Sequence, residues 1–217
     1  MMDLTTEQLI HRWKTRDFSW SQISSYEYNP EGWYDRYILH NKSPDTPELL
    51  FGRKIGKLME EGKSIDKKEK VVLPRLSKME HKFRVKFGSL QMVGYCDSFC
   101  TNTNKKLYEF KTGVAKWNKK RVDAHGQLDM YLLMNYITNN IKPEDVDVAL
   151  FWIPTKRVPR DNGDFSGFDY DIKLVEPVEY KTFKAKRTLT DILNFGARIN
   201  KTYKDMERFI IEKNTLS

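Results

Sequence analysis

The chain contains 217 residues, of which 39% are hydrophobic and 31% are charged. This length is within the range of one domain, and the composition is that of a soluble globular protein with a modest core. No run approaches the ~20 apolar residues that a transmembrane helix needs, so no membrane association is expected. The N-terminus lacks the basic and apolar regions of a signal peptide, which predicts a cytoplasmic protein.

Basic residues outnumber acidic ones, 38 against 30, which gives a net charge of +8 and an isoelectric point of about 9.3. This excess favours a polyanionic partner, because neutralisation of phosphates drives sequence-independent binding to nucleic acid. Charge alone is weak support, since many basic proteins bind no nucleic acid. The distribution of the cations along the chain therefore carries more weight.

The sequence has two cysteines, Cys96 and Cys100. Two cysteines form no disulfide framework, and this number is typical of a protein from a reducing compartment. Two thiolates cannot complete a tetrahedral zinc site by themselves. We therefore expect buried or half-buried free thiols.

The N-terminal segment predicts helices that pack through aromatic side chains. A short helix over residues 5–15 would direct three side chains inward, namely Leu9, Ile10 and Trp13. The next helix begins at Ser19, where Gln22 would complete a capping box. The aromatic residues that follow are interpreted as packing core rather than as platforms for bases, namely Trp33, Tyr34 and Tyr37.

Residues 47–61 give the clearest helical pattern of the chain. Thr46 is a capping residue, Pro47 fits the first helical position, and Gly62 can end the helix. One face of this helix would carry two glycines and a carboxylate, Gly52, Gly56 and Glu60. Glycines inside a helix cost stability, so the pair indicates a close approach to a neighbouring backbone or to DNA.

Three predicted strands follow, and the second and third, which a polar segment connects, carry the most informative residues. Strands over 80–87 and 90–99 would be joined by a hairpin at Gly88 and Ser89, and a third strand would cover 106–112. Side chains alternate between the faces of a strand, so three charged groups can share one face, namely Asp97, Glu109 and Lys111. Charge on an apolar sheet is costly unless it is paired or holds a metal. Two carboxylates beside a lysine suit Mg²⁺.

The segment after this third strand gathers cations around one indole, Lys116, Trp117, Lys119, Lys120 and Arg121. Cations beside a stacking aromatic ring favour contact with a nucleic-acid strand, whereas the alternative is a solvated loop with its tryptophan tucked into the core. A helix over 124–138, capped by Asp123, would bury Leu128, Leu132, Leu133 and Ile137. Gln127 and Tyr131 lie one turn apart on this helix and, by pattern alone, belong to its surface.

The remainder of the chain predicts strands over 146–153 and 168–175, with a loop between them over 160–167. A basic, strand-like segment follows over 180–187. Thr188 and Asp191 then form the pattern of a capping box at the start of a long amphipathic helix over 189–212.

The order Asp97, then Glu109-Phe110-Lys111, then Gln127 and Tyr131 resembles a known set of motifs. These are the D…(D/E)xK and QxxxY motifs of the PD-(D/E)XK nuclease superfamily, in its RecB-like branch, of which lambda exonuclease is a more distant, phage-type relative. The resemblance implies a restriction-endonuclease-like core of the α/β (α+β) class, in which helices flank both faces of a mixed central sheet. It predicts a single nuclease domain over 1–217, with an N-terminal helical part (1–46), a core (47–153) and C-terminal strands with a helix (154–217).

The resemblance also implies a Mg²⁺-dependent deoxyribonuclease, with Mn²⁺ as an alternative metal. The metal would be held by Asp97, Glu109, the backbone carbonyl of Phe110 and an acidic residue of the preceding helix. Relatives often have a histidine where this chain has Gly56, so this last ligand is expected to be Glu60, with Glu61 and Glu80 as alternatives. Lys111 would orient the attacking water or stabilise developing charge. Gln127 and Tyr131 would position a DNA phosphate or Lys111.

Some relatives carry an iron–sulfur cluster bound by a cysteine that precedes a proline in the N-terminal segment. In this chain the residue before Pro30 is Asn29, and the C-terminal region has no cysteine triplet. We therefore expect no iron–sulfur cluster.

The expected function is an exonuclease that hydrolyses phosphodiester bonds in DNA recombination, repair or phage DNA processing. The protein would act on DNA in the cytoplasm of a bacterium or of a phage-infected host. The motifs are also compatible with a recombinase or a single-strand-binding protein as partner, and with a homo-oligomer. Three alternatives stay open: a structure-specific endonuclease of the same fold, an inactive nuclease-fold DNA-binding module, and an unrelated basic protein. Nucleases with these motifs can cleave in the 5′→3′ or the 3′→5′ direction and can prefer single or double strands. Their substrate can be DNA or RNA.

Overall fold

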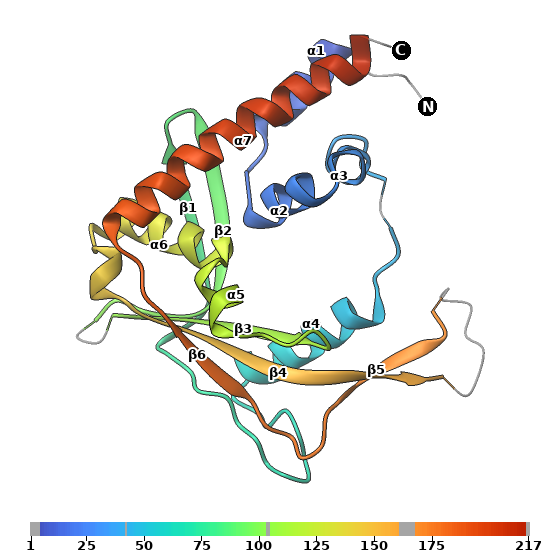
Figure 1. The fold of residues 1–217 in the computed structure, drawn as a ribbon, viewed down its shortest axis with the longest axis vertical. Helices are drawn as coiled ribbons and strands as arrows, with labels where there is room; N and C mark the ends of the chain where they lie inside the picture. Colours follow the sequence, from blue (N-terminus) through green and yellow to red (C-terminus); the bar gives the residue numbers. More distant parts are fainter. Residues whose placement is uncertain (1–4, 42, 103–104, 161–167, 216–217) are drawn as a thin grey trace.

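A computed structural model describes residues 5–41, 43–102, 105–160 and 168–215. Its described strands form one twisted, mixed sheet (Figure 1). They are β1 (Lys78–Phe87), β2 (Leu90–Cys100), β3 (Lys106–Gly113), β4 (Asp147–Pro159), β5 (Tyr170–Leu174) and β6 (Lys181–Ala185).

The strand order is β1-β2-β3-β4-β5, and β6 also pairs with β4. β3 and β4 are parallel, whereas the other paired strands are antiparallel. β6 pairs with residues 148–152 of β4 and β5 with residues 155–159, so both strands lie along the same edge of β4. The parallel pair requires a crossover connection, which the helices between β3 and β4 supply.

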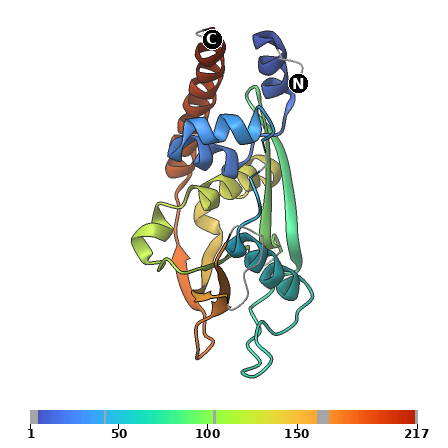
Figure 2. The ribbon, with the colours of Figure 1, turned by 90° about the vertical axis from the view of Figure 1, so that its right-hand side faces the viewer.

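Helices cover both faces of the sheet (Figures 1 and 2). Ile153 of β4 packs in the cluster that contains α4, whereas its neighbour Trp152 packs in the cluster that contains α6 and α7. The described helices are α1 (Thr6–Thr15), α2 (Trp20–Tyr28), α3 (Pro30–Tyr37), α4 (Pro47–Glu60), α5 (Lys119–Asp123), α6 (Gly126–Asn139) and α7 (Leu189–Thr215), with a 3₁₀ turn at Pro143–Asp145. The predicted fold class, a mixed sheet flanked by helices on both faces, is confirmed.

The N-terminal helices are anchored by aromatic packing. Trp13 stacks on Tyr203 of α7 at a centroid distance of 4.9 Å and meets Trp33 edge-on at 5.3 Å. α1 and the C-terminal half of α7 consequently lie side by side (Figure 2). Trp33 and Tyr34 are buried, as the sequence predicted. The same buried cluster takes residues from all three predicted parts of the chain, for example Leu9, Met92 and Ile199.

Two predicted helix caps are confirmed, and two others are wrong. Thr46 accepts the backbone N–H of Leu49, and the Thr188–Asp191 capping box is formed. Ser19 instead makes no capping bond, because Gln22 donates to the backbone carbonyl of Asp17. Asp123 does not cap the following helix. It ends the separate helix α5 and pairs there with Lys119.

Three further expectations are settled by burial and by helix length. Ile137, predicted to be buried, is 40% exposed, because it lies on the outer side of α6. Cys96 is a buried free thiol and Cys100 a half-buried one, as predicted. Within the described ranges, no helix has the length and apolar character needed to cross a membrane.

The glycines of two helices predict opposite effects of adding one methyl group. A Cβ at Gly126 would fall onto the Trp20 ring and lie 3.1 Å from Phe195, whereas a Cβ at Gly56 would meet nothing within 4 Å. We expect Gly126→Ala to lower the free energy of unfolding by ~1–3 kcal/mol through overpacking. Gly56→Ala should raise it by up to ~1 kcal/mol through helix propensity. Urea unfolding of both variants tests this pair, and a change of the same sign in both would contradict it.

Candidate active site

A fork between two strands positions Asp97. Among the residues that the structure describes, β2 and β3 pair only through Ser98–Tyr108, Phe99–Leu107 and Cys100–Lys106. Beyond these pairs the strands separate, and the Asp97 carboxylate accepts the backbone N–H of Phe110 at 2.7 Å. The side chain thus takes the place of a strand-to-strand hydrogen bond and is fixed at the point where the sheet opens.

Glu109 and Lys111 follow on the same face of β3. Glu109 is only 1% exposed, and its Oε1 lies 2.6 Å from Nζ of Lys111. Its second oxygen, Oε2, is buried and has no hydrogen-bond partner among the described residues. An unsatisfied buried carboxylate oxygen is costly. Glu109 therefore offers an oxygen that a bound cation could satisfy.

The two motif residues of α6 are linked to Lys111 by a chain of hydrogen bonds. Lys111 Nζ donates to Gln127 Oε1 at 2.7 Å, and Gln127 Nε2 donates to the Tyr131 hydroxyl at 2.6 Å. Tyr131 in turn donates to the backbone carbonyl of Tyr95 in β2. Tyr131 is buried rather than on the helix surface. The carbonyl of Tyr95 was missed from the sequence, because a backbone atom carries no residue-type signal.

Burial governs the protonation of this cluster. Burial, and then the charge of Asp97, raises the pKa of Glu109 to about 8. Burial also raises the pKa of Asp97, although Lys111 and the Phe110 N–H oppose this shift. Burial alone would lower the pKa of Lys111, but the two carboxylates outweigh it and raise that pKa. Burial raises the pKa of Tyr131, so its hydroxyl remains a hydrogen-bond donor at neutral pH.

Asp97 and Lys111 line a pocket of about 640 Å³ between the strand fork and α4, whereas Glu109 is not among its lining residues. Gly56 lines it and leaves open space, whereas a Cβ at Gly52 would lie 3.4 Å from the Thr112 hydroxyl. The close approach expected at these glycines therefore involves a side chain at Gly52 and no protein atom at Gly56. The acidic residues that line the pocket are Glu48, Glu60, Glu61, Glu80 and Asp97.

The donor set suits a hard divalent cation. Asp97 and Glu109 supply oxygens at the fork, and carboxylate oxygen is the ligand type that Mg²⁺ and Mn²⁺ prefer. Within the described part of the chain, no three His, Cys, Asp or Glu side chains form a group that could hold a metal ion. A metal that uses one or two carboxylates, waters and substrate phosphate fits this arrangement, and that is the usual coordination of Mg²⁺.

The basic segment before α6 combines the two alternatives predicted for it. Trp117 is half-buried: its ring meets His125 edge-on at 4.9 Å, and the Arg121 guanidinium lies 4.3 Å from its centroid. The indole is therefore part of the packing, and Arg121 occupies the place near its ring where a base would stack. Lys116 and Lys120 are exposed.

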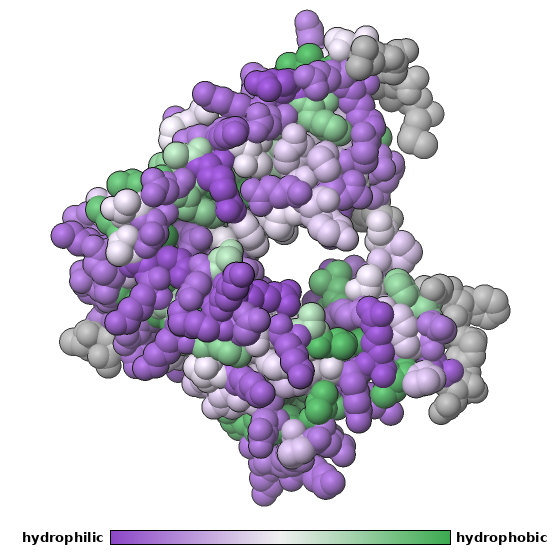
Figure 3. All heavy atoms as spheres, in the orientation of Figure 1, coloured by the Kyte–Doolittle hydropathy of each residue, from purple (hydrophilic) through white to green (hydrophobic). Residues whose placement is uncertain are grey.

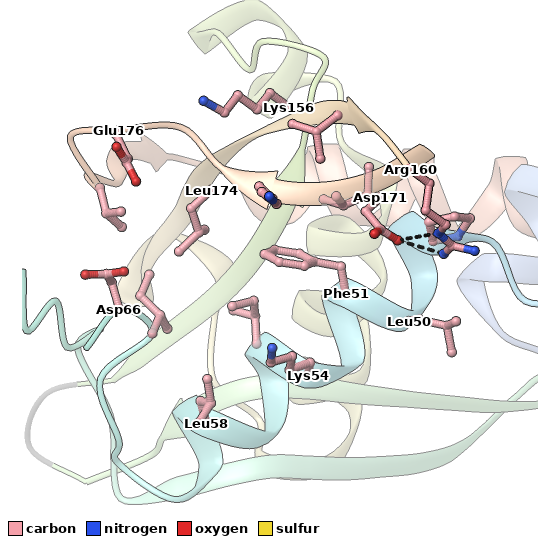
Figure 4. Close-up of a pocket in the computed structure, with 17 residues that line it drawn as sticks. Leu50, Phe51, Lys54, Leu58, Asp66, Lys156, Arg160, Asp171, Leu174 and Glu176 are labelled. Carbon is pink, nitrogen blue, oxygen red and sulfur yellow. Dashed lines mark hydrogen bonds and ion pairs between the residues drawn. The ribbon is translucent and has the colours of Figure 1, made fainter. Parts of the chain in front are cut away.

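A second hollow of about 780 Å³ lies against a different face of α4 (Figure 4). Phe51 and Leu174 form its apolar wall, and an ion pair of 2.7 Å joins Arg160 and Asp171 at one end. Although larger, this hollow is not lined by any residue of the Asp97–Glu109–Lys111 cluster. We therefore assign the chemistry to the smaller pocket.

Comparison with known proteins supports the fold. No protein-family model and no curated protein matches the sequence. Among solved structures, the crystal structure of a "putative exonuclease" from Eubacterium rectale is similar, with a TM-score of 0.52 and 10% sequence identity. The match covers 99% of this chain and 88% of the other. At this identity the similarity establishes a shared fold.

The raised pKa of Glu109 predicts how the stability of the metal-free protein depends on pH. Between its ordinary value of 4.5 and about 8, the folded protein holds a proton that the unfolded chain has released. The free energy of unfolding should therefore fall as the pH rises through this interval, and then level off. Glu109→Gln cannot titrate, so in EDTA it should become progressively more stable than the wild type across the interval.

Thermal unfolding in EDTA from about pH 5 to about pH 9 measures this difference. Glu144→Gln, which changes an exposed carboxyl, serves as the control. Parallel melting curves for wild type and Glu109→Gln across the interval would contradict the prediction.

Proposed function

We propose that this protein is a metal-dependent DNA nuclease of the RecB-like type, using Mg²⁺ or Mn²⁺, and specifically an exonuclease. One observation carries the proposal: Asp97 and Glu109 meet at a strand fork, beside a lysine held by a Gln127–Tyr131 pair. The fold shared with a protein named as an exonuclease supports it. Such an activity would serve recombination, repair or phage DNA processing.

Each residue has a distinct task in phosphodiester hydrolysis. A bound metal supplies a lowered pKa for its water and neutralises charge on the transferring phosphate. Asp97 and Glu109 would hold the metal ion at the fork, where Glu109 has an oxygen without a hydrogen-bond partner among the described residues. The Phe110 carbonyl and Glu60 remain the further ligands that the motif resemblance suggests.

Lys111 is placed to act on the substrate. An ammonium has three N–H donors, and Lys111 gives two of them to Glu109 and Gln127. The third can reach a phosphate oxygen or the attacking water, because the side chain is 27% exposed. Gln127 and Tyr131 act through Lys111: they fix its direction, and the buried hydroxyl anchors the chain to β2.

The shape of the molecule favours an exonuclease over an endonuclease. The space-filling view shows an opening between the region of α2 and α3 and the region of α4 and β4 (Figure 3). α4 also lines the site pocket. A strand that has to thread through such an opening needs a free end, which circular DNA lacks.

Cleavage assays test the activity and its dependence on Lys111. We expect labelled linear DNA to be degraded in Mg²⁺ or Mn²⁺ but not in EDTA, and closed circles to be spared. Lys111→Ala should lower the rate by about 100-fold or more, because it removes a charge aimed at the transition state. Lys204→Ala, an exposed change on α7, is the control.

Circular dichroism of each variant confirms that the fold is retained. The position of the label gives the polarity, and parallel substrates distinguish single from double strands and DNA from RNA. Cutting of circles would instead identify an endonuclease. Binding without cleavage in any metal would favour an inactive DNA-binding module.

The exposed lysines near α5 predict a salt-dependent contribution to DNA binding. Lys116→Ala combined with Lys120→Ala should weaken binding and reduce the slope of log affinity against log salt by roughly 0.7–0.9 for each phosphate that is no longer neutralised. Fluorescence anisotropy of labelled DNA in EDTA measures the slope. An unchanged slope, equal to that of Lys204→Ala, would remove this surface from the DNA path.

A further inference from the structure

The β1–β2 hairpin presents one of its faces to solvent beside the candidate site. α6 packs against the other face, where a Cβ added at Gly94 would fall 2.8 Å from the Tyr131 ring. Cross-strand pairing places Phe83 opposite Gly94 and Lys82 opposite Tyr95. Because side chains alternate between the two faces of a strand, Lys82 and Tyr95 point away from α6.

This open face of the hairpin is basic. Lys82, Arg84 and Lys86 occupy every second position of β1, and all three are exposed. Arg84 pairs with Asp17, whereas Lys82 and Lys86 have no ion pair with any described residue. These three residues of β1, together with Tyr95, are called the hairpin stripe below. The stripe offers two uncompensated cations to a polyanion.

Tyr95 adds an accessible aromatic ring to the stripe. The residue is 50% exposed, and Lys82 Nζ lies 5.6 Å from the ring centroid, near the outer limit of a cation–π contact. Trp117 differs, since it is half-buried and the Arg121 guanidinium lies 4.3 Å from its centroid. The Tyr95 ring therefore has surface on which a planar partner can stack.

The hairpin stripe begins next to the candidate site. Tyr95 lies two residues before Asp97 on β2, about 7 Å along the strand. The backbone carbonyl of Tyr95 accepts the Tyr131 hydroxyl, which belongs to the hydrogen-bond chain that holds Lys111. The position of Tyr95 is thus fixed relative to the groups expected to contact the scissile phosphate, at a distance that one nucleotide can span.

We propose that the hairpin stripe binds a single-stranded part of the DNA substrate next to the scissile phosphate, with one base stacked on Tyr95 and neighbouring phosphates at Lys82 and Lys86. Stacking on an aromatic ring beside cations is the usual way to hold a single strand without regard to its sequence. In duplex DNA both faces of a base are covered by its neighbours, so this ring favours unpaired DNA. The inference rests on the proposed function, because it names the form of DNA that the same site takes.

Fluorescence anisotropy with labelled single-stranded and duplex DNA tests the role of Tyr95. The measurements use the Lys111→Ala protein in Mg²⁺ as the parent, so that metal can bind while cleavage is slow. Adding Tyr95→Leu should raise the dissociation constant for single-stranded DNA about 5- to 100-fold, and that for duplex DNA much less. Tyr95→Phe keeps the ring and should bind as the parent does. Lys204→Ala is the control.

The lysines of the stripe have a separate signature in the same assay. Lys82→Ala combined with Lys86→Ala should reduce the slope of log affinity for single-stranded DNA against log salt by roughly 0.7 for each phosphate that is no longer neutralised. Thermal unfolding of these variants should stay close to that of the parent, because the substituted side chains are exposed. An unchanged slope would contradict the phosphate contacts at these lysines.

Three results for Tyr95 would overturn the inference: unchanged affinity in Tyr95→Leu, an equal loss in Tyr95→Phe, or an equal loss for duplex DNA. A Lys111→Ala protein that binds no single-stranded DNA would overturn it as well, since the stripe contains no residue of the Asp97–Glu109–Lys111 cluster. If any of these occurs while the wild type cleaves DNA in Mg²⁺, the proposed function stands. A wild type that neither binds nor cleaves DNA would overturn both.

Discussion

The candidate site depends on one hydrogen bond, from the backbone N–H of Phe110 to the carboxylate of Asp97 at 2.7 Å. This bond lies where β2 and β3 stop pairing. The Asp97 side chain therefore accepts a backbone N–H of β3 that has no partner in the ladder between the two strands. If the ladder continued, Asp97 and Glu109 would lie in a closed sheet with no access for a substrate. Because the strands diverge, Asp97 and Lys111 line a pocket that lies against α4.

The fold tolerates unfavourable electrostatics around this fork. A buried ion pair such as Glu109–Lys111 is weak evidence for stability, because its desolvation offsets much of its attraction. Glu109 keeps an unpartnered oxygen, and Glu80 keeps a left-handed backbone next to a second carboxylate. Strain and unpaired charge of this kind persist where the surrounding structure over-determines them, and they cluster at functional sites. The wide aromatic and aliphatic core, which joins the N-terminal helices to α7, supplies that surrounding structure.

Periodicity and end signals predicted most elements well. Alternation in β1 predicted that Phe83 and Val85 are buried, and both are. The boundaries of α4 followed from Thr46, Pro47 and Gly62, because capping is a local interaction. Sequence patterns failed where distant contacts compete. Gln22 finds the Asp17 carbonyl rather than its cap, and Ile137 points outward because α7 and the sheet already cover the rest of α6.

The sequence by itself determined which residues of the site are carboxylates, and that Glu109 and Lys111 share one face of their strand, because strand alternation depends only on spacing. Tertiary structure alone decided how they are used. It placed Gln127 against Lys111, buried Tyr131 against a backbone carbonyl, and set Glu80 opposite Asp97. The physical reason is that burial and pairing arise from strand register and helix packing, which join residues far apart in the chain and leave no periodic trace in any one segment.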